Sequence, residues 1–262
     1  MSKKILAIQS ISCHGASSIT ASLPILSSFG IEAAILPTCI KASNNQDVIV
    51  DLTDEMPKII NHWIDENIKF DAIYTSNIND YKQADYVLKC KEYLLNPNGI
   101  LFVDPQMGDS GTQYVNNDIF YGLKKICMDA DYLIPNVTSA CLLTDIEYKD
   151  IHDSSFINEL LSKLIEIGPK QIILTSVMDD EDSIGAIGYD GFTKTTIIKE
   201  LIEKSYHGTK DIFSSIVLAD ILNGKSMKDT LDHATDFILD SITDTMDDNN
   251  HDYALKFEHL LK

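Results

Sequence analysis

Short apolar runs alternate with amphipathic stretches along this chain, and this alternation limits the possible fold more than any other feature. Residues 4–9 and 31–36 each contain a run typical of a buried strand. Residues 17–29 between them have the pattern of a helix, and Gly30 is expected to end it. A strand, a helix and a second strand in this order predict parallel strands joined by a right-handed crossover.

The same alternation continues to the end of the chain. Further strands are expected at 70–75, 100–103, 132–134 and 172–175, and helices from about 54, at 81–96, 116–130, 154–167 and 226–245, with a short one from Thr138. Asp190-Gly191, between the runs 184–189 and 192–198, predicts an antiparallel hairpin. Without a repeat or linker, residues 1–262 are expected to form one α/β domain whose ligands bind beyond the carboxyl ends of the strands.

The net charge of −19 argues against a nucleic acid or an anionic membrane as a partner. It also means that an anionic ligand such as ATP needs local positive potential from helix ends, Mg²⁺ or a placed lysine. No apolar run approaches the roughly 20 residues of a membrane span, and the first residues lack the pattern of a signal peptide. Five cysteines without close pairing predict a reduced, cytoplasmic protein.

The stretch 205–213 carries the clearest chemical signal. Asp211 follows the turn-prone pair Gly208-Thr209 and precedes a helical run of apolar residues: Ile212, Ile216, Ala219 and Leu222. The backbone N–H groups of residues 208–211 would lie unpaired at the start of this helix, where anions bind. A carboxylate beside such a site can take a proton from an attacking hydroxyl. The alternative is that Asp211 only caps the helix.

The stretch 208–211 resembles the Gly-Thr-Gly-Asp signature of the ribokinase-like kinases, most closely the pyridoxal and pyridoxamine (vitamin B6) kinases. The resemblance extends over essentially the whole chain, including residues 24–30, 51–57 and 70–75. It implies a three-layer α/β/α fold with a central, mostly parallel sheet. It also implies that the γ-phosphoryl group of ATP is transferred to the 5'-hydroxymethyl group of a B6 vitamer. Asp211 would be the catalytic base, and Gly208, Thr209 and Lys210 would form the anion hole, with Lys210 in place of the second glycine.

A second motif, Asp104-Pro-Gln-Met-Gly-Asp109, resembles the Asp-Pro-Val-Met-Gly-Asp of the family. Two carboxylates at a strand end suit Mg²⁺, which takes oxygen ligands and keeps several waters. The resemblance places both near the metal and the triphosphate, so Asp104 and Asp109 are the expected metal ligands. Gly108 would let the backbone approach a phosphate. Alternatively, the segment is a turn closed by an aspartate cap.

The resemblance also names ATP-binding residues: Asp109, Asn136, Thr175 and Ser176. Asn136 fits the family's Asn-x-x-Glu, but Ser139 stands where the glutamate would be. Thr175-Ser176 could also be an ordinary helix cap. For the vitamer, Ser10 and Ser43 are the expected contacts.

Two loops on the vitamer side depart from the family, at residues 42–47 and 76–80. In the second, glycines that would allow close backbone approach are replaced.

Three functions remain open from these residues. The first is a pyridoxal or pyridoxamine kinase that uses ATP and Mg²⁺, acting as a homodimer by resemblance. The second is a catalytically impaired homologue that binds a nucleotide or another ligand. The third is a kinase for a different hydroxymethyl heterocycle, such as hydroxymethylpyrimidine. Lys210 fits the first as a cation near developing negative charge, and the second as a side chain that blocks the hole.

Overall fold

The structure is a computed structural model that describes residues 3–43, 48–248 and 253–261. Its first half contains β1 (Lys4–Ser12), α1 (Ile19–Ser28), β2 (Glu32–Lys41), β3 (Ile49–Asp51), α2 (Met56–Asp65), β4 (Phe70–Ser76), α3 (Tyr81–Leu94), β5 (Leu95–Asp104), β6 (Gly108–Asp109), β7 (Thr112–Gln113) and α4 (Asn117–Met128). The second half contains β8 (Tyr132–Leu133), α5 (Val137–Thr144), α6 (Ser154–Ile167), β9 (Gln171–Val177), β10 (Ser183–Tyr189), β11 (Lys194–Glu200), α7 (Thr209–Leu222), α8 (Met227–Met246) and a final turn of 3₁₀ helix at Glu258–Leu260.

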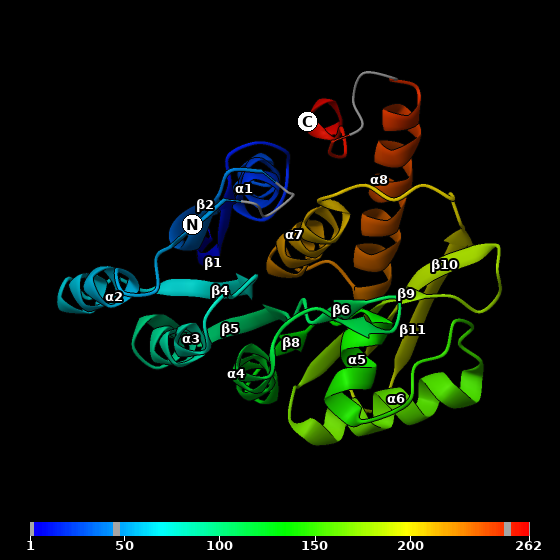
Figure 1. Cartoon of the computed structure of the whole chain (residues 1–262), viewed down its shortest axis with the longest axis horizontal. Helices are drawn as coiled ribbons and strands as arrows, with labels where there is room; N and C mark the ends of the chain where they lie inside the picture. The colour runs from blue at the N-terminus through cyan, green and yellow to red at the C-terminus, as the bar shows by residue number, and fades with distance from the viewer. Residues whose placement is uncertain (1–2, 44–47, 249–252, 262) are drawn as a thin grey trace.

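Nine strands form one sheet in the order β11-β10-β9-β8-β5-β4-β1-β2-β3 (Figure 1). The six central strands, from β9 to β2, pair in parallel. The sheet becomes antiparallel only towards its edges, where β3 pairs with β2, and β10 pairs with β9 and β11. The expected central, mostly parallel sheet is therefore confirmed.

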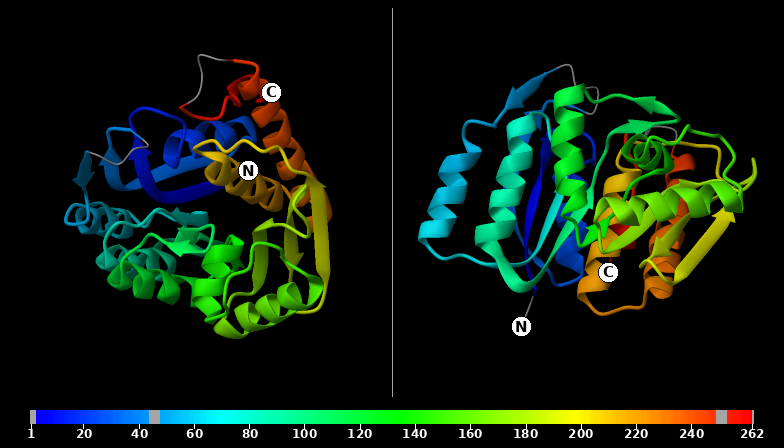
Figure 2. Two further views of the ribbon diagram at one scale, coloured as in Figure 1. Left: turned by 45° about the vertical axis from the view of Figure 1, so that its right-hand side comes forward. Right: turned by 90° about the horizontal axis from the view of Figure 1, so that it is seen from below.

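Helices cover both faces of this sheet, so the molecule has three layers (Figures 1 and 2). On one face, α2 to α6 pack around a core that includes Ile60, Val87 and Leu160. On the other face, α1, α7 and α8 pack around a second core that includes Ile25 and Ile216. The expected three-layer α/β/α fold is confirmed, because apolar faces of helices bury both sides of the sheet.

The hairpin signal at Asp190-Gly191 is also confirmed. Tyr189 pairs with Lys194 at the end of the β10–β11 ladder. Asp190 closes the turn, since its Oδ1 accepts hydrogen bonds from the N–H groups of Phe192 at 2.9 Å and Thr193 at 2.6 Å. Gly191 has a φ of +91°, which a glycine adopts without steric strain.

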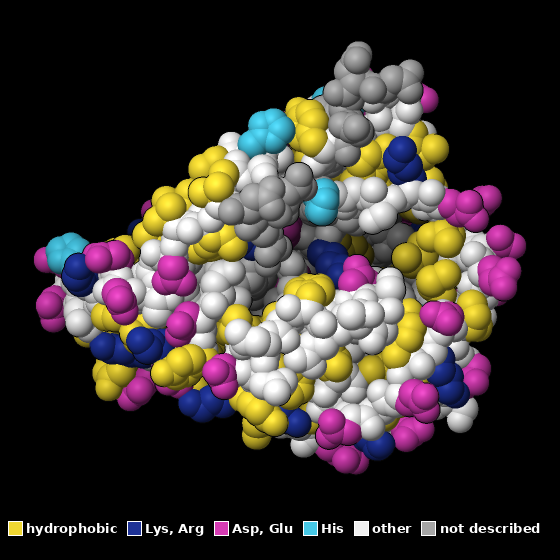
Figure 3. Space-filling model, viewed as in Figure 1, with side chains coloured by type: hydrophobic (Ala, Val, Ile, Leu, Met, Phe, Trp, Pro, Cys, Tyr) yellow, Lys and Arg dark blue, Asp and Glu magenta, His cyan; other side chains and the backbone are white. Residues whose placement is uncertain are grey.

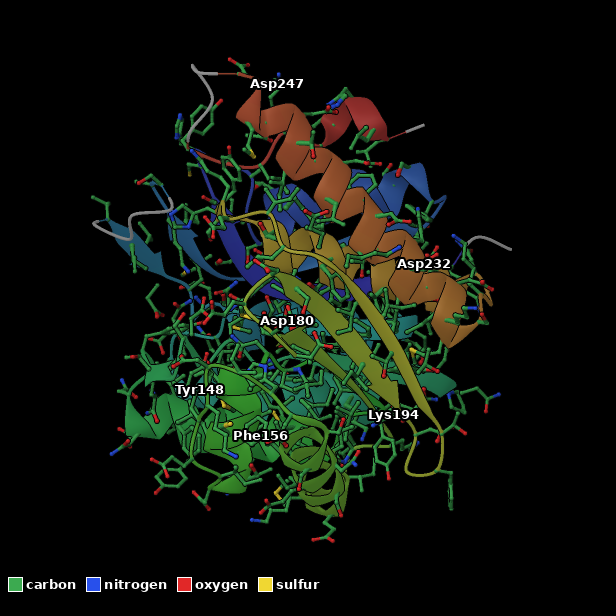
Figure 4. All side chains as sticks on the ribbon, turned by 90° about the vertical axis from the view of Figure 1, so that its right-hand side faces the viewer. Tyr148, Phe156, Asp180, Lys194, Asp232 and Asp247 are labelled. Atoms are coloured by element: carbon green, nitrogen blue, oxygen red, sulfur yellow. The ribbon has the colours of Figure 1, made fainter. Side chains whose placement is uncertain are left out.

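Charged side chains join this edge hairpin to the last long helix. Lys199 of β11 forms ion pairs with Asp232 and Asp236 of α8, at 2.8 and 3.0 Å. Figure 4 labels Asp232 on α8, and Lys194 at the far end of the hairpin. None of the described helices combines the length and apolar character needed to cross a membrane.

The structure adds three strands that the sequence pattern did not indicate: β3, β6 and β7. Each has only two or three residues, which is too short for a periodicity to be recognised. β6 and β7 pair with each other and form a small separate hairpin within the 104–114 loop. The strand expected from residue 100 begins earlier, at Leu95, where it pairs with Phe70 of β4.

Candidate active site

Asp211 lies in the first turn of α7 and is almost completely buried, with 5% of its surface exposed. Both carboxylate oxygens are held by residues distant in sequence. Oδ2 accepts from the backbone N–H of Ser18 at 2.8 Å, and Oδ1 accepts from Nε2 of Gln106 at 3.1 Å. The helix begins after Gly208, so the alternative that Asp211 is only the N-cap is wrong.

Burial raises the pKa of Asp211 above its ordinary value, because a charge is less well solvated inside the protein. The hydrogen bonds from Ser18 and Gln106 oppose this rise. A carboxylate with a raised pKa is a stronger base, and its two hydrogen bonds fix its orientation.

The start of α7 leaves an anion site open beside this carboxylate. Gly208 is the N-cap and offers no side-chain cap. The N–H groups of Thr209, Lys210 and Asp211 have no acceptor within the helix, and none is found among the described residues. Three N–H groups at the positive end of a helix dipole form a binding site for a phosphoryl group.

Gly208 brings this helix start against the loop that follows β1. Its φ is +91°, and a Cβ atom at this position would lie 2.0 Å from the carbonyl oxygen of Ala16. Only glycine fits here, because any side chain would collide with backbone. The close approach also explains how Ser18, two residues after Ala16, reaches Asp211.

Asp104 lies at the carboxyl end of β5 and is 5% exposed. Its Oδ2 accepts a hydrogen bond from the hydroxyl of Ser214 in α7 at 2.9 Å. Burial, and then the negative charge of Asp211, raise the pKa of Asp104 to about 7. The two acids therefore lie close enough to interact electrostatically across the gap between β5 and α7.

The raised pKa predicts that Asp104→Asn makes the metal-free protein more stable at pH 8. The ordinary pKa of the group is 3.8, so above pH 7 Asp104 is ionised in both states, but only the folded state lacks its hydration. The carboxylate then destabilises the fold by on the order of a few kcal/mol, and the effect fades as pH falls from 7 towards 4. Thermal unfolding at pH 8 and pH 4, in the presence of a chelator, measures it.

Asp109→Asn is the matched control, since the Asp109 side chain is 63% exposed and should barely change the unfolding temperature. A melting temperature of Asp104→Asn at or below that of the wild type at pH 8 would contradict the assignment of Asp104 as a strained carboxylate.

Lys210 reaches towards the β6–β7 hairpin. Its Nζ lies 3.4 Å from Oδ2 of Asp109, and one third of the lysine side chain is exposed. Figure 3 shows a hollow near the centre of the face that it displays, and a basic and an acidic side chain lie next to each other there. Lys210 thus places a cation close to the helix start without contacting Asp211 directly.

Side chains at the start of α5 hold the hairpin loop in place. Asn136 caps α5 by accepting from the N–H of Ser139, and its Nδ2 donates to the carbonyl of Gly108. Thr138 accepts from the N–H of Gly111, and Ser139 accepts from that of Met107. Ser139, where the family carries a glutamate, therefore binds backbone.

The backbone around Gly108 leaves no room for a side chain. A Cβ atom there would lie 2.4 Å from the carbonyl oxygen of Thr112, within the β6–β7 hairpin.

Thr175 and Ser176 lie near the end of β9, so the alternative that they cap a helix is wrong. Thr175 pairs with Asn136 through a β-bridge, and Ser176 has a φ of +59°.

The two residues expected to contact the vitamer differ in their surroundings. Ser10 is buried and donates its hydroxyl hydrogen to Oγ of Ser18 at 3.0 Å, which links it to Asp211 through the Ser18 backbone. Ser43 is half-buried after β2. Residues 44–47 of the same loop lie outside the described residues.

Sequence reasoning missed Ser18, Gln106 and Asn77. Nδ2 of Asn77 donates to Oγ of Ser18 at 3.0 Å, so it belongs to the same network. Its φ is +51°, in the left-handed region that asparagine adopts more readily than most residues. Asn77 thus keeps a backbone conformation that glycine adopts easily, while the expected loss of close backbone approach in the 76–80 loop stays a prediction. The available signal was that Gln106 and Asn77 both lie at departures from the family motifs.

The residues at this site suit a magnesium ion that is held partly by a substrate. Among the described residues, no three His, Cys, Asp or Glu side chains gather into a metal-binding cluster. Mg²⁺ commonly binds one or two carboxylates, and phosphate oxygens and waters complete its shell. Asp104 and Asp109 offer two such carboxylates on the same loop.

Comparison with known proteins identifies relatives of this chain. The family model for phosphomethylpyrimidine kinase matches residues 7–255. The pyridoxal kinase of Dictyostelium discoideum is 28% identical over 239 residues, which cover 83% of this chain and 78% of that protein.

Solved structures give the same result. A Bacteroides thetaiotaomicron VPI-5482 protein, assigned as a phosphomethylpyrimidine kinase, superposes with a TM-score of 0.94 at 31% identity, covering 99% of this chain and 93% of that one. A second crystal form of it, with pyridoxal, gives a TM-score of 0.91 at 32% identity, covering 100% and 96%. The pyridoxal kinase of Lactobacillus plantarum, 22% identical over 99% of this chain and 95% of that one, shares the fold with a TM-score of 0.88. The ribokinase-like architecture implied by the sequence is confirmed.

Proposed function

The chain belongs to the phosphomethylpyrimidine kinase family, and from this premise we propose that it is an ATP-dependent pyridoxal/pyridoxamine kinase. It would phosphorylate the 5'-hydroxymethyl group of a B6 vitamer, which makes it a phosphotransferase with an alcohol acceptor. The Dictyostelium relative is a pyridoxal kinase, and pyridoxal accompanies one crystal form of the Bacteroides relative. The single observation that carries the proposal is a buried, doubly hydrogen-bonded Asp211 beside three unpaired N–H groups.

In the proposed reaction, Asp211 takes the proton of the hydroxymethyl group as the oxygen of that group attacks the γ-phosphorus of ATP. The bond from the γ-phosphorus to the β–γ bridging oxygen breaks, and ADP leaves. Ser18 and Gln106 keep the carboxylate pointed at the incoming hydroxyl. The N–H groups of residues 209–211, with Gly208 shaping the turn, stabilise negative charge on the transferring phosphoryl group. Positioning and electrostatics of this kind supply most of the catalysis in phosphoryl transfer.

Cationic help for the triphosphate falls to lysine, because the chain contains no arginine. Lys210 is the lysine at the helix start, and its pairing with Asp109 supports its role as a phosphate contact rather than a plug in the anion hole. We propose that the ATP-binding side of the site is lined by Asn136, Thr175 and Ser176, where the start of α5 meets the end of β9. Asp109 would contact both ATP and the metal.

We propose Mg²⁺ as the metal, held by Asp104 and Asp109. When bound, the ion neutralises charge on the phosphates and helps to align them. Asp104 contributes a buried carboxylate whose Oδ2 is already oriented by Ser214. Asp109 contributes an exposed carboxylate that can exchange Lys210 for another cation.

The impaired-homologue alternative is not favoured, because the base, the N–H groups and both loop carboxylates are present together. The alternative acceptor, hydroxymethylpyrimidine, keeps support from the family description itself. Ser10 and Ser43 remain our proposed contacts to the acceptor ring.

We also propose a homodimer formed along the β3 edge of the sheet. Val48, Ile49 and Val50 are 60%, 43% and 53% exposed there, and an unpaired edge strand invites pairing with a second chain. Light scattering would give twice the mass of one chain.

A cytoplasmic location remains part of the proposal, and the five free cysteines are consistent with it.

The proposed function is tested by offering the acceptors one at a time. ADP release by the purified protein with MgATP is measured with pyridoxal, pyridoxamine, pyridoxine and hydroxymethylpyrimidine. We expect turnover with the B6 vitamers and a lower kcat/KM for the pyrimidine. A preference for the pyrimidine would reverse the substrate assignment, and ATP binding without turnover of any acceptor would favour the impaired homologue.

A further inference from the structure

Lys41 is a buried lysine that forms no ion pair with any acid among residues 3–43, 48–248 and 253–261. It is the last residue of β2, and only 8% of its surface is exposed. Its Nζ makes no ion pair or hydrogen bond with any residue that the structure describes. Buried lysines are almost always paired, because an ammonium group loses its hydration inside a protein. Within the described part of the chain, Lys41 therefore lacks the hydrogen-bonding partner that a buried lysine normally has.

The position of Lys41 puts it on the acceptor side of the candidate active site. It pairs in register with Ser12 of β1, so the two side chains leave the sheet on the same face. Ser10, two residues before Ser12, points to that face as well, and its hydroxyl contacts Ser18. The positive charge of Lys41 also lowers the pKa of Asp211, which shows that the two groups interact across this space.

The described neighbours of Lys41 do not pair with its ammonium group. Cys39 lies two residues earlier on β2, and burial raises the pKa of its thiol, so it is neutral at physiological pH. Asp211 interacts with Lys41 electrostatically, but its oxygens accept hydrogen bonds from Ser18 and Gln106 and none from Lys41. Since no described residue accepts a hydrogen bond from Lys41, and an ammonium group only donates, a ligand with an acceptor group would suit this position.

B6 vitamers share one feature that would meet this need. Their pyridine ring carries a hydroxyl group two ring positions from the hydroxymethyl group, and this hydroxyl ionises readily when the ring nitrogen is protonated. The hydroxymethylpyrimidine ring instead carries an amino group, which donates hydrogen bonds as lysine does. An ammonium group that faces the ring would therefore favour the binding of a B6 vitamer over that of hydroxymethylpyrimidine.

We propose that Lys41 is a specificity-determining residue that binds the ring oxygen of B6 vitamers and discriminates against amino-substituted pyrimidines. This inference rests on the proposed function, because it names how the same site selects its acceptor. A charge-assisted hydrogen bond of this kind changes affinity by about 10- to 100-fold.

The test compares two ligands in two variants. Lys41→Met removes the charge and keeps the length of the side chain, while Lys163→Met, on the surface of α6, is the matched control. Calorimetry measures the Kd of each protein for pyridoxine and for the pyridoxine analogue that lacks the ring hydroxyl. We expect Lys41→Met to bind pyridoxine about 10- to 100-fold more weakly, and to bind the analogue as the wild type does.

Each outcome decides the proposal. Equal losses for pyridoxine and the analogue, or no loss for either, would overturn it, and thermal unfolding confirms that the variant is folded. Should Lys41→Met fail to fold, Lys41→Gln is measured in the same way. Because binding is measured without ATP, absence of turnover in the wild type would refute the kinase assignment without deciding the role of Lys41.

Discussion

Asp211→Asn is expected to lower kcat for phosphorylation of pyridoxal by about 10³-fold, within the range associated with loss of a general base. The amide keeps the size of the carboxylate, and its oxygen can still accept from the N–H of Ser18. It cannot take the proton of the hydroxymethyl group. Binding of ATP and pyridoxal should stay within about threefold of wild type, because the loss concerns a charge that acts mainly during transfer.

Asp118→Asn is the matched control for this prediction. Asp118 also lies in the first turn of a helix, α4, but it is exposed and makes no contact with the site. Its kcat should equal that of the wild type. Retention of more than one tenth of wild-type kcat in Asp211→Asn would show that the base is another group.

Gly208→Ala is expected to abolish most turnover and to destabilise the protein. The added methyl group would collide with the Ala16 carbonyl, so the start of α7 must move. Movement displaces the N–H groups of residues 209–211 from the phosphoryl group, and losing one such donor lowers kcat by about 10²- to 10³-fold. Movement also breaks the contact from Ser18 to Asp211. Steady-state kinetics and thermal unfolding measure both effects.

Gly224→Ala is the control that distinguishes the collision at Ala16 from the backbone strain of a left-handed alanine. Gly224 has a φ of +80°, close to the +91° of Gly208, but a Cβ atom there would meet nothing within 4 Å. We expect Gly224→Ala to lose about 1–2 kcal/mol of stability, the strain of a left-handed non-glycine residue, and to keep full kcat. If the two variants lost the same stability and both kept kcat, the close approach at Ala16 would not matter for catalysis.

The sequence predicted the large elements of this fold well because their periodicities are strong. The Ser154–Ile167 and Met227–Met246 helices lie within a residue of their expected limits, and each starts after a side chain that caps it. The short strands β3, β6 and β7 could not be predicted, since they depend on pairing with neighbours.

The candidate site also contains residues that a sequence motif indicates and residues that no local pattern indicates. Asp211 and Asp104 stood out because each lies in a motif next to a strand or helix terminus. The groups that control them are distant in sequence: Ser18 is 193 residues from Asp211, and Ser214 is 110 residues from Asp104. No local pattern encodes such contacts, because they follow from how α1, α7 and β5 pack together.

Ser139 stands where the family carries a glutamate, and the sequence did not indicate what its hydroxyl would contact. In the structure the Ser139 hydroxyl accepts from the N–H of Met107, within the loop that carries Asp104 and Asp109. The substitution therefore keeps a structural role on the same loop, which a sequence pattern cannot show.

The central claim is that this site transfers a phosphoryl group from ATP to the 5'-hydroxymethyl group of a B6 vitamer, with Asp211 as the base. The most direct measurement follows label from γ-labelled ATP into pyridoxal, with identification of the product by mass and chromatography, in wild type and Asp211→Asn. We predict labelled pyridoxal 5'-phosphate from the wild type, and about 10³-fold slower formation by the variant. ATP and pyridoxal that both bind while no label reaches the vitamer would contradict the claim.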